Sequence, residues 1–447
     1  MRSMTLTGRT ISSLAADLAA GKTTSRALTE SALSAIAKHS GAFTLVTAER
    51  ARAEANASDT LRKAGVVASP LAGVPVSVKD LFDVAGEVTT AGTDVLRDAA
   101  PALHDAPVIG RLRAAGAVIV GRTHMSEFAF TGLGVNPHYP PCPNPHDATR
   151  VPGGSSSGAG VSVALGQAAM GLGTDTGGSV RIPAAFCGVV GFKPTRDRIT
   201  REGGFPLSQT LDSFGPLANS VSCCALVDAL IADAPVAKHP PLGVGGLRLG
   251  VPTDFVLDGV DDVVGRAFER TLSRLSAAGA RVERVSIPAL KRMPEITARG
   301  TIANAEAFAI HTRLGLLKKR ERYDQIVLSR IDVGGKMSAQ DYLDLLYARA
   351  ALIAEVAPVS VRYDALVLPT CPTVPPRFDE VADAASFGKL NNLTLRNSSV
   401  FNYLDRCALN VPMQADGELP SGLMIVGEHM ADARLLAIGA AIEAALR

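Results

Sequence analysis

Two serine-bearing glycine turns stand out between residues 151 and 195. The first reads GGSSSG around Ser155, and the second reads TDTGGS and ends at Ser179. Glycine concentrates where the backbone takes a positive φ or passes close to another group. A small-residue segment of helical length joins the turns, which can therefore bring hydroxyls and bare main-chain N–H groups to one point. A single turn of this kind is usually structural, so whether these two turns have a catalytic role depends on residues elsewhere in the chain.

A lysine closes the strand pattern upstream of these turns. Val74, Val76 and Val78 alternate as in a β-strand, and Lys79 follows them directly. Most lysines in such a place reach the surface or pair with a neighbour, here Asp80. A lysine kept from water has a lowered pKa instead, and its neutral amine can act as a base.

Together these groups are sufficient for acyl transfer without histidine. A serine hydroxyl is a weak nucleophile until a neighbouring group removes its proton. A neutral lysine can do so, and a second serine can carry the proton where the lysine does not reach. The TDTGGS turn offers consecutive N–H groups for the negative oxygen that forms during acyl transfer. The sequence has no G-x-x-x-x-G-K-[ST] loop, no G-x-G-x-x-G spacing and no HExxH. We therefore expect neither a cofactor nor a metal.

The composition restricts which partners the protein is expected to bind and the compartment in which it is expected to function. The 447 residues include 45 basic and 43 acidic ones, and these charges are scattered, which argues against nucleic-acid binding. The six cysteines form no CxxC pair and read as buried thiols of a reducing compartment. No secretory signal and no long apolar run is evident. We expect a soluble cytoplasmic protein that does not contact the membrane.

Strand and helix patterns alternate along the chain. Helices are expected near 10–20, 25–40, 47–63, 219–232, 261–278 and 431–446, with mainly helical structure over 294–360. Strands are expected over 74–79, 247–252, 280–288, 363–372 and 421–427, with a helix and then a strand over 105–121. Residues 233–245 read as a linker. This alternation predicts one large α/β domain over residues 1–447 with a mixed, largely parallel sheet.

Three segments resemble the signature of the amidase signature family: GVPVSVKD, PGGSSSGAG and GLGTDTGGSVRIPAAFCGVVGFKPT. The resemblance implies that Ser179 is the nucleophile, that Ser155 is a bridging serine on a cis peptide bond, and that Lys79 is the general base. It also implies an oxyanion hole built from the N–H groups of Thr176, Gly177, Gly178 and Ser179. Asp175 and Arg181 are similar to residues that fix the shape of this turn.

The resemblance also sets expectations for the whole chain. It implies a sheet of about eleven strands wrapped by helices, and a homodimer. Residues 1–65 would form a helical edge, 66–232 the signature core, and 246–447 the rest of the sheet with the substrate-pocket helices.

Substrate contacts are expected outside the signature, in the loops 123–147, 200–213, 300–335 and 372–402. Met125, Phe128 and Phe130 are candidate wall residues, and Gly154 is a candidate substrate contact. Other polar candidates are Arg320, Arg322, Tyr323, Asn391 and Arg396.

These features favour an amidohydrolase that cleaves a C–N bond of a small amide through a Ser179 acyl-enzyme. One alternative is the glutaminase (A) subunit of a tRNA-dependent amidotransferase, which shares the signature. Others are a catabolic carboxybiuret-type hydrolase and an aminomuconate-type deaminase. A binding protein that has lost catalysis is a fourth hypothesis, weakened by the presence of all three implied triad residues.

Overall fold

A single twisted sheet runs through the whole molecule. The computed structural model describes residues 5–235 and 242–447, and within them eleven strands pair in the order β1-β3-β2-β4-β6-β5-β10-β11-β9-β7-β8. The strands are β1 (Phe43–Val46), β2 (Pro75–Lys79), β3 (Val118–Thr123), β4 (Met170–Asp175), β5 (Val190–Lys193), β6 (Ser213–Ala218), β7 (Arg248–Pro252), β8 (Arg281–Val285), β9 (Ala365–Pro369), β10 (Ala408–Pro412) and β11 (Gly422–Val426).

The sheet is mixed, as expected, but parallel pairing does not dominate it. Strand β2 pairs in parallel with β3 and β4, and β7 does so with β8 and β9. The strands expected over 247–252 and 280–288 and the helix expected between them thus form a parallel β-α-β unit of β7, α8 (Asp262–Ala277) and β8. All pairings of β5, β6, β10 and β11 are antiparallel. Strands β10 and β11 follow each other through a short connection, which requires them to run in opposite directions.

Helices wrap the sheet, and several of them begin at a capping side chain. Thr24 Oγ1 accepts from the Ala27 N–H at 3.0 Å at the start of α2 (Ser25–Lys38), and Thr301 and Ser338 form capping boxes at α10 (Ile302–Arg313) and α12 (Ala339–Ser360). The helices are α1 (Ile11–Ala19), α2 (Ser25–Lys38), α3 (Ala48–Lys63), α4 (Pro107–Ala114), α5 (Ser157–Ala164), α6 (Arg181–Cys187), α7 (Val221–Ile231), α8 (Asp262–Ala277), α9 (Met293–Ile296), α10 (Ile302–Arg313), α11 (Gln325–Gly335), α12 (Ala339–Ser360), α13 (Ala384–Tyr403) and α14 (Asp432–Leu446).

The core occupies both faces of the sheet. On β11, Leu423 and Ile425 pack into one hydrophobic cluster, and Met424 and Val426 pack into another. This alternation is the two-residue period of a strand whose two faces are both covered. The first cluster includes side chains of α4, α7, α8 and α14, and the second includes side chains of α12 and α13.

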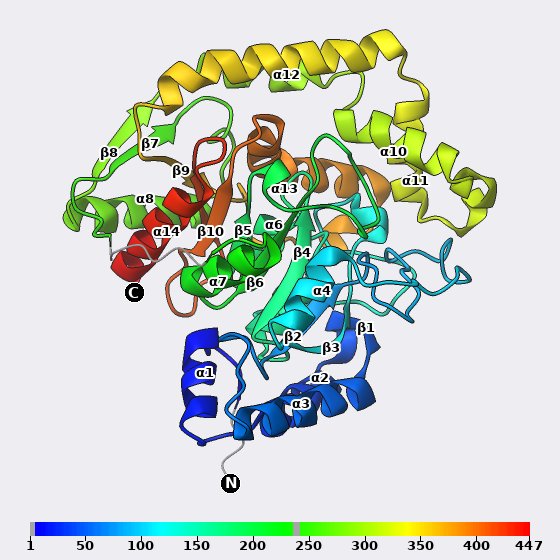
Figure 1. The fold of residues 1–447 in the computed structure, drawn as a ribbon. Coiled ribbons are helices and arrows are strands. Elements are labelled where there is room, and N and C mark those ends of the chain that lie inside the picture. The colour runs from blue at the N-terminus through cyan, green and yellow to red at the C-terminus, as the bar shows by residue number, and fades with distance from the viewer. Residues whose placement is uncertain (1–4, 236–241) are drawn as a thin grey trace.

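The two halves of the chain form one domain because β5 pairs with β10. Figure 1 shows α1, α2 and α3 at one end of the molecule and α12 spanning the other. Residues 236–241 of the expected linker lie outside the described residues. No helix among the described residues is long and apolar enough to cross a bilayer.

Candidate active site

Lys79 and Thr174 meet at the ends of two neighbouring strands. Strands β2 and β4 are parallel, with Val78 opposite Leu172, so their carboxyl ends lie at the same edge of the sheet. The Lys79 Nζ lies 2.8 Å from Thr174 Oγ1. The lysine does not reach the surface, because its side chain is completely buried. The segment that ends at Lys79 and the segment that contains Thr174 are thus brought together by strand pairing within the sheet.

Ser155 lies next to the lysine amine. Its Oγ is 2.7 Å from Lys79 Nζ, within hydrogen-bond distance, and both groups are fully buried. The Gly154–Ser155 peptide bond is cis, as the resemblance implies. The Gly154 N–H donates to the Gly132 carbonyl at 2.8 Å, and the Ser126 N–H donates to the Ser155 carbonyl at 3.2 Å. The main chain around Ser155 is therefore held on both sides.

The residue after Ser155 connects it to the second glycine turn. The Ser156 N–H donates to the Ser179 carbonyl at 3.2 Å, and Ser156 Oγ donates to the Thr174 carbonyl, also at 3.2 Å. Helix α5 starts at Ser157 and packs closely against the Ala42 carbonyl, because Gly158 has no Cβ. A Cβ at Gly158 would collide with this carbonyl. The structure thus brings both predicted serine turns together.

A buried ion pair shapes the turn that carries Ser179. The Asp175 carboxylate accepts from the main-chain N–H groups of Gly178 at 2.8 Å and Val180 at 3.1 Å. Arg181 donates to the same carboxylate at 2.9 and 3.0 Å. Burial on its own raises the pKa of Asp175, but the charge and hydrogen bonds of Arg181, the charge of Lys193 and a hydrogen bond from Asn402 together outweigh burial. They hold that pKa well below its usual range. Asp175 and Arg181 therefore act as the structural support that the sequence indicated.

Helix α13 also stabilises the turn that carries Ser179. The hydroxyls of Ser398 and Ser399 donate to the Gly177 carbonyl at 2.7 and 3.0 Å. Gly178 has φ +132, and a Cβ there would collide with Ser398 Oγ. Only glycine fits this position without strain.

These contacts revise the expected oxyanion hole. The Gly178 N–H is engaged by Asp175, so it stabilises the turn and is not a free donor. The N–H groups of Thr176, Gly177 and Ser179 remain as candidates. The side chain of Thr176 also has a structural role, since its hydroxyl donates to Asp212 Oδ1 at 2.5 Å.

The electrostatics of the site favour a neutral lysine. Burial lowers the pKa of Lys79 from 10.5 to about 7, although the carboxylates of Asp212 and Asp175 act in the opposite direction. No carboxylate of the described chain forms an ion pair with this amine. Burial also raises the pKa of Asp212 to about 6. Near neutral pH a substantial fraction of Lys79 is uncharged and can accept a proton.

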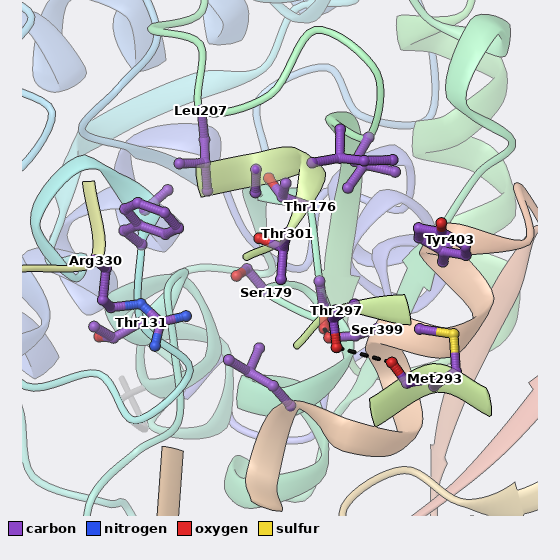
Figure 2. A pocket seen from close by; sticks show the side chains of 17 residues that line it. Thr131, Thr176, Ser179, Leu207, Met293, Thr297, Thr301, Arg330, Ser399 and Tyr403 are labelled. Atoms are coloured by element: carbon purple, nitrogen blue, oxygen red, sulfur yellow. Dashed lines mark hydrogen bonds between the residues drawn. The ribbon is translucent and has the colours of Figure 1, made fainter. Parts of the chain in front are cut away.

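A cavity of about 130 Å³ opens onto Ser179 (Figure 2). Its wall is largely apolar, with Phe130, Leu207, Leu211 and Met293 among the lining side chains. Hydroxyl groups are distributed over it, and Arg330 is the one charged residue among those that line it. The hydroxyls belong to Thr131, Thr176, Ser179, Thr297, Thr301, Ser399 and Tyr403. A small, mostly apolar molecule with a few polar groups fits such a wall.

Three expected substrate contacts do not line this cavity. Phe128 has φ +47, which turns its ring into a buried cluster with Phe205, His311 and Tyr323. Met125 is completely buried, and its carbonyl accepts from Asn136 Nδ2. Gly154 supports Ser155 through its main chain. The wall is formed instead by the next residues along the chain, Ala129, Phe130 and Thr131, so that only the expectation for Phe130 is confirmed.

The polar candidates from the outer loops are already paired. Arg320 pairs with Asp332, Arg322 pairs with Asp94 and Asp98, and the Tyr323 hydroxyl contacts His311. Asn391 Oδ1 accepts from the Gly132 N–H, although its buried Nδ2 has no hydrogen-bond partner in the described chain, and Arg396 donates to the carbonyls of Val256 and Asp258. Arg330 lies in the expected 300–335 segment, but the sequence alone offers no signal that separates it from the other arginines there.

The geometry agrees with comparisons to known proteins. The profile of the family described as Amidase matches residues 27–436. A 2-amino-5-chloromuconic acid deaminase of Comamonas testosteroni is 40% identical over 403 residues, 88% of this chain and 86% of that protein. The glutamyl-tRNA(Gln) amidotransferase of Chromohalobacter salexigens has a subunit that is 35% identical over 471 residues, 96% of this chain and 95% of that one. A solved structure described as an amidase superposes with a TM-score of 0.89 at 36% identity, over 98% of this chain and 100% of that chain.

The chain belongs to the amidase family, since the profile covers most of its length. It is an enzyme that hydrolyses carbon–nitrogen bonds of the amide type. The fold and the reaction class expected from the signature segments are thereby confirmed.

Proposed function

We propose that Ser179 is the nucleophile of this amidohydrolase, that Ser155 relays its proton, and that Lys79 is the general base. The observation that carries the proposal is the 2.7 Å separation of Lys79 Nζ and Ser155 Oγ in a fully buried place beside the Ser179 turn. A buried lysine with a lowered pKa and two flanking hydroxyls satisfies what a neutral base requires.

The reaction proceeds in two halves. Neutral Lys79 takes the proton of Ser155 as Ser155 takes that of Ser179, and Ser179 Oγ attacks the amide carbon. The leaving nitrogen receives the proton along the same path, the C–N bond breaks, and an ester to Ser179 remains. Water then attacks the ester with the same relay as base, which releases the acid and restores Ser179.

The negative oxygen of each tetrahedral intermediate needs N–H donors. The groups of Thr176, Gly177 and Ser179 supply them, while the Asp175 carboxylate holds the turn through Gly178 and Val180. Donors fixed before the reaction cost no reorganisation as the charge develops.

Labelling with a fluorophosphonate tests the roles. We expect the native enzyme to be labelled at Ser179, and Ser179→Ala to lose labelling and at least about 10³-fold of its amide hydrolysis. Ser155→Ala and Lys79→Ala should label slowly while they remain folded. Ser157→Ala is the matched control, since its Oγ contacts only the Ser155 carbonyl in the described chain, and it should label normally. Labelling of a serine other than Ser179 would overturn the assignment.

We further propose that the enzyme works as a free-standing cytoplasmic homodimer on a small amide, without cofactor or metal. The similarity to a component of a glutamyl-tRNA(Gln) amidotransferase over 96% of the chain keeps the glutaminase role as the second candidate. The similarity to a 2-amino-5-chloromuconic acid deaminase favours a catabolic enzyme instead, and a carboxybiuret-type hydrolase belongs to the same catabolic class. Size-exclusion chromatography with assays on glutamine, with and without tRNA, separates the candidates: an active dimer indifferent to tRNA supports the free-standing enzyme.

A further inference from the structure

Arg330 brings a positive charge to the active-site cavity without a negative partner. It lies on α11 and lines the same cavity as Ser179. Its Nε is buried and has no hydrogen-bond partner, and no carboxylate of the described chain forms an ion pair with its guanidinium. Arg330 as a whole is half-buried, but a buried N–H donor such as its Nε is costly to leave without a partner. The guanidinium of Arg330 therefore lacks an anionic partner, since no acidic side chain of the described chain provides one.

Two other arginines of this segment have acidic partners. Arg320 and Arg322 pair with Asp332, Asp94 and Asp98. Arg181, deeper in the site, pairs with Asp175. Arg330 has no acidic partner among the described residues, and its half-buried side chain lines the cavity.

A second unsatisfied polar group lies on the same wall. Thr131 Oγ1 is buried without a hydrogen-bond partner, and Thr131 lines the cavity. In the view of Figure 2, Arg330 and Thr131 lie on one side of Ser179, while Tyr403 and Met293 lie on the other. The charged fork of Arg330 and the hydroxyl of Thr131 thus lie at one end of the cavity, whereas Thr297, Ser399 and Tyr403 at the other end carry hydroxyls and no charge.

The arginine is held in position. Its guanidinium carbon lies 5.1 Å from the centre of the Phe130 ring, and Phe130 also lines the cavity. Its main-chain carbonyl accepts from Asn304 Nδ2 at 2.8 Å, and Asn304 belongs to the capping box of α10. The side chain is therefore oriented before any ligand arrives.

We propose that Arg330, together with Thr131, binds a carboxylate of the substrate, so that the enzyme acts on small amides that also carry a carboxylate group. This inference rests on the proposed function for the bond that is cleaved. The planar fork of a guanidinium matches the two oxygens of a carboxylate. The cavity of about 130 Å³ restricts the choice to a small molecule whose carboxylate and scissile amide are a few bonds apart.

The same wall discriminates against neutral amides. A neutral amide in place of the carboxylate leaves the guanidinium partly unpaired, and sites with buried polar groups reject ligands that fail to pair them. A monoamide of a dicarboxylic acid and the corresponding diamide have nearly the same shape and differ in this one group. The pair therefore isolates the contribution of the charge.

Binding to Ser179→Ala measures that contribution without turnover. Malonamate, succinamate and glutaramate are titrated by calorimetry against malonamide, succinamide and glutaramide. We expect at least one carboxylate amide to bind about 10- to 100-fold more tightly than its diamide. Adding Arg330→Met should abolish this preference, and Arg330→Lys should restore part of it. Arg320→Met removes the same charge from an exposed ion pair outside the cavity and should leave the preference unchanged.

Thermal unfolding separates recognition from a structural role. Because the charge of Arg330 is unpaired, Arg330→Met in the native enzyme should keep or raise Tm. The inference is overturned if none of the three carboxylate amides binds more tightly than its diamide, or if Arg330→Met weakens both members of a pair equally. Fluorophosphonate labelling keeps the two proposals apart: labelled Ser179 with no carboxylate preference rejects only the role of Arg330. A carboxylate preference without labelled Ser179 rejects only the proposed nucleophile.

Discussion

The amine of Lys79 has two hydroxyl neighbours, and no carboxylate of the described residues forms an ion pair with it. Its Nζ lies 2.7 Å from Ser155 Oγ and 2.8 Å from Thr174 Oγ1. Lys79 is on β2 and Thr174 is on the neighbouring strand β4, so the pairing of these strands fixes one contact of the amine. The other contact, with Ser155, comes from the first glycine turn. A carboxylate in place of either hydroxyl would hold the lysine charged. The arrangement instead keeps the amine available as a base.

The pH dependence of the reaction should follow Lys79. Since its pKa is lowered to about 7, the base is protonated and inactive below that pH and neutral above it. We expect kcat/KM for an uncharged amide to rise through about pH 7 to a plateau. Lys79→Arg should reduce the plateau by about 10²- to 10⁴-fold, because arginine stays protonated. A flat profile between pH 5 and 9 in the native enzyme would contradict the role of Lys79.

Lys79 should also affect stability, with a defined sign. The pKa of this amine is about 7 when folded and near 10.5 when unfolded, so the unfolded chain binds more protons between these values. The lysine's contribution to stability is therefore lowest below pH 7 and improves as pH rises toward 10. We expect Lys79→Met to have a Tm at least equal to that of the native enzyme at pH 6.5, with the difference narrowing by pH 9.5. A difference that widens with pH would show that the amine is charged when folded.

Thr174 should act as a positioning residue for the amine. Thr174→Val keeps the shape but removes the hydroxyl 2.8 Å from Nζ, and we expect kcat to fall about tenfold with KM little changed. Thr174→Ser keeps the hydroxyl and is the matched control. The acid limb of the pH profile should move in Thr174→Val and stay in place in Thr174→Ser. Native-like kcat in Thr174→Val together with a loss in Thr174→Ser would indicate that the methyl group matters and the hydroxyl does not.

The Ser179 turn should tolerate no side chain at Gly178. With φ +132 and Ser398 Oγ in the way, Gly178→Ala should destabilise the protein by about 1–3 kcal/mol. It should also reduce kcat strongly, since it displaces the adjacent N–H donors. Gly388 on α13 is half-buried, but a Cβ there meets no atom within 4 Å, so Gly388→Ala should be neutral or slightly stabilising. Chemical denaturation and steady-state kinetics measure both effects; native-like kinetics in Gly178→Ala would exclude a role for the turn.

The candidate chemistry was predictable where it depends on local sequence. The alternation of Val74, Val76 and Val78 places Lys79 on a buried strand, and the glycines around Ser155 and Ser179 mark the two turns. Strand and helix periodicity likewise predicted most helices and six of the eleven strands, because burial of one face leaves a repeat in the chain; β1, β4, β5, β6 and β10 were not predicted. The resemblance of the three segments then assigned the roles. The share of antiparallel pairing was missed, since single-strand patterns carry no information on the direction of a neighbour.

Other features were decided only by tertiary structure. Which arginine stays unpaired depends on where acidic residues from distant segments fall: Asp94 and Asp98 reach Arg322, and no acid of the described chain reaches Arg330. The positive φ at Phe128 turns its ring away from the cavity and leaves Phe130 and Thr131 on the wall. The Asp175 carboxylate accepts a hydrogen bond from the Gly178 N–H only because the turn folds back on the end of β4. The sequence by itself thus indicated the proposed bond-breaking groups, which lie in contiguous motifs. The wall of the cavity is instead assembled from separate segments by long-range packing that no local pattern encodes.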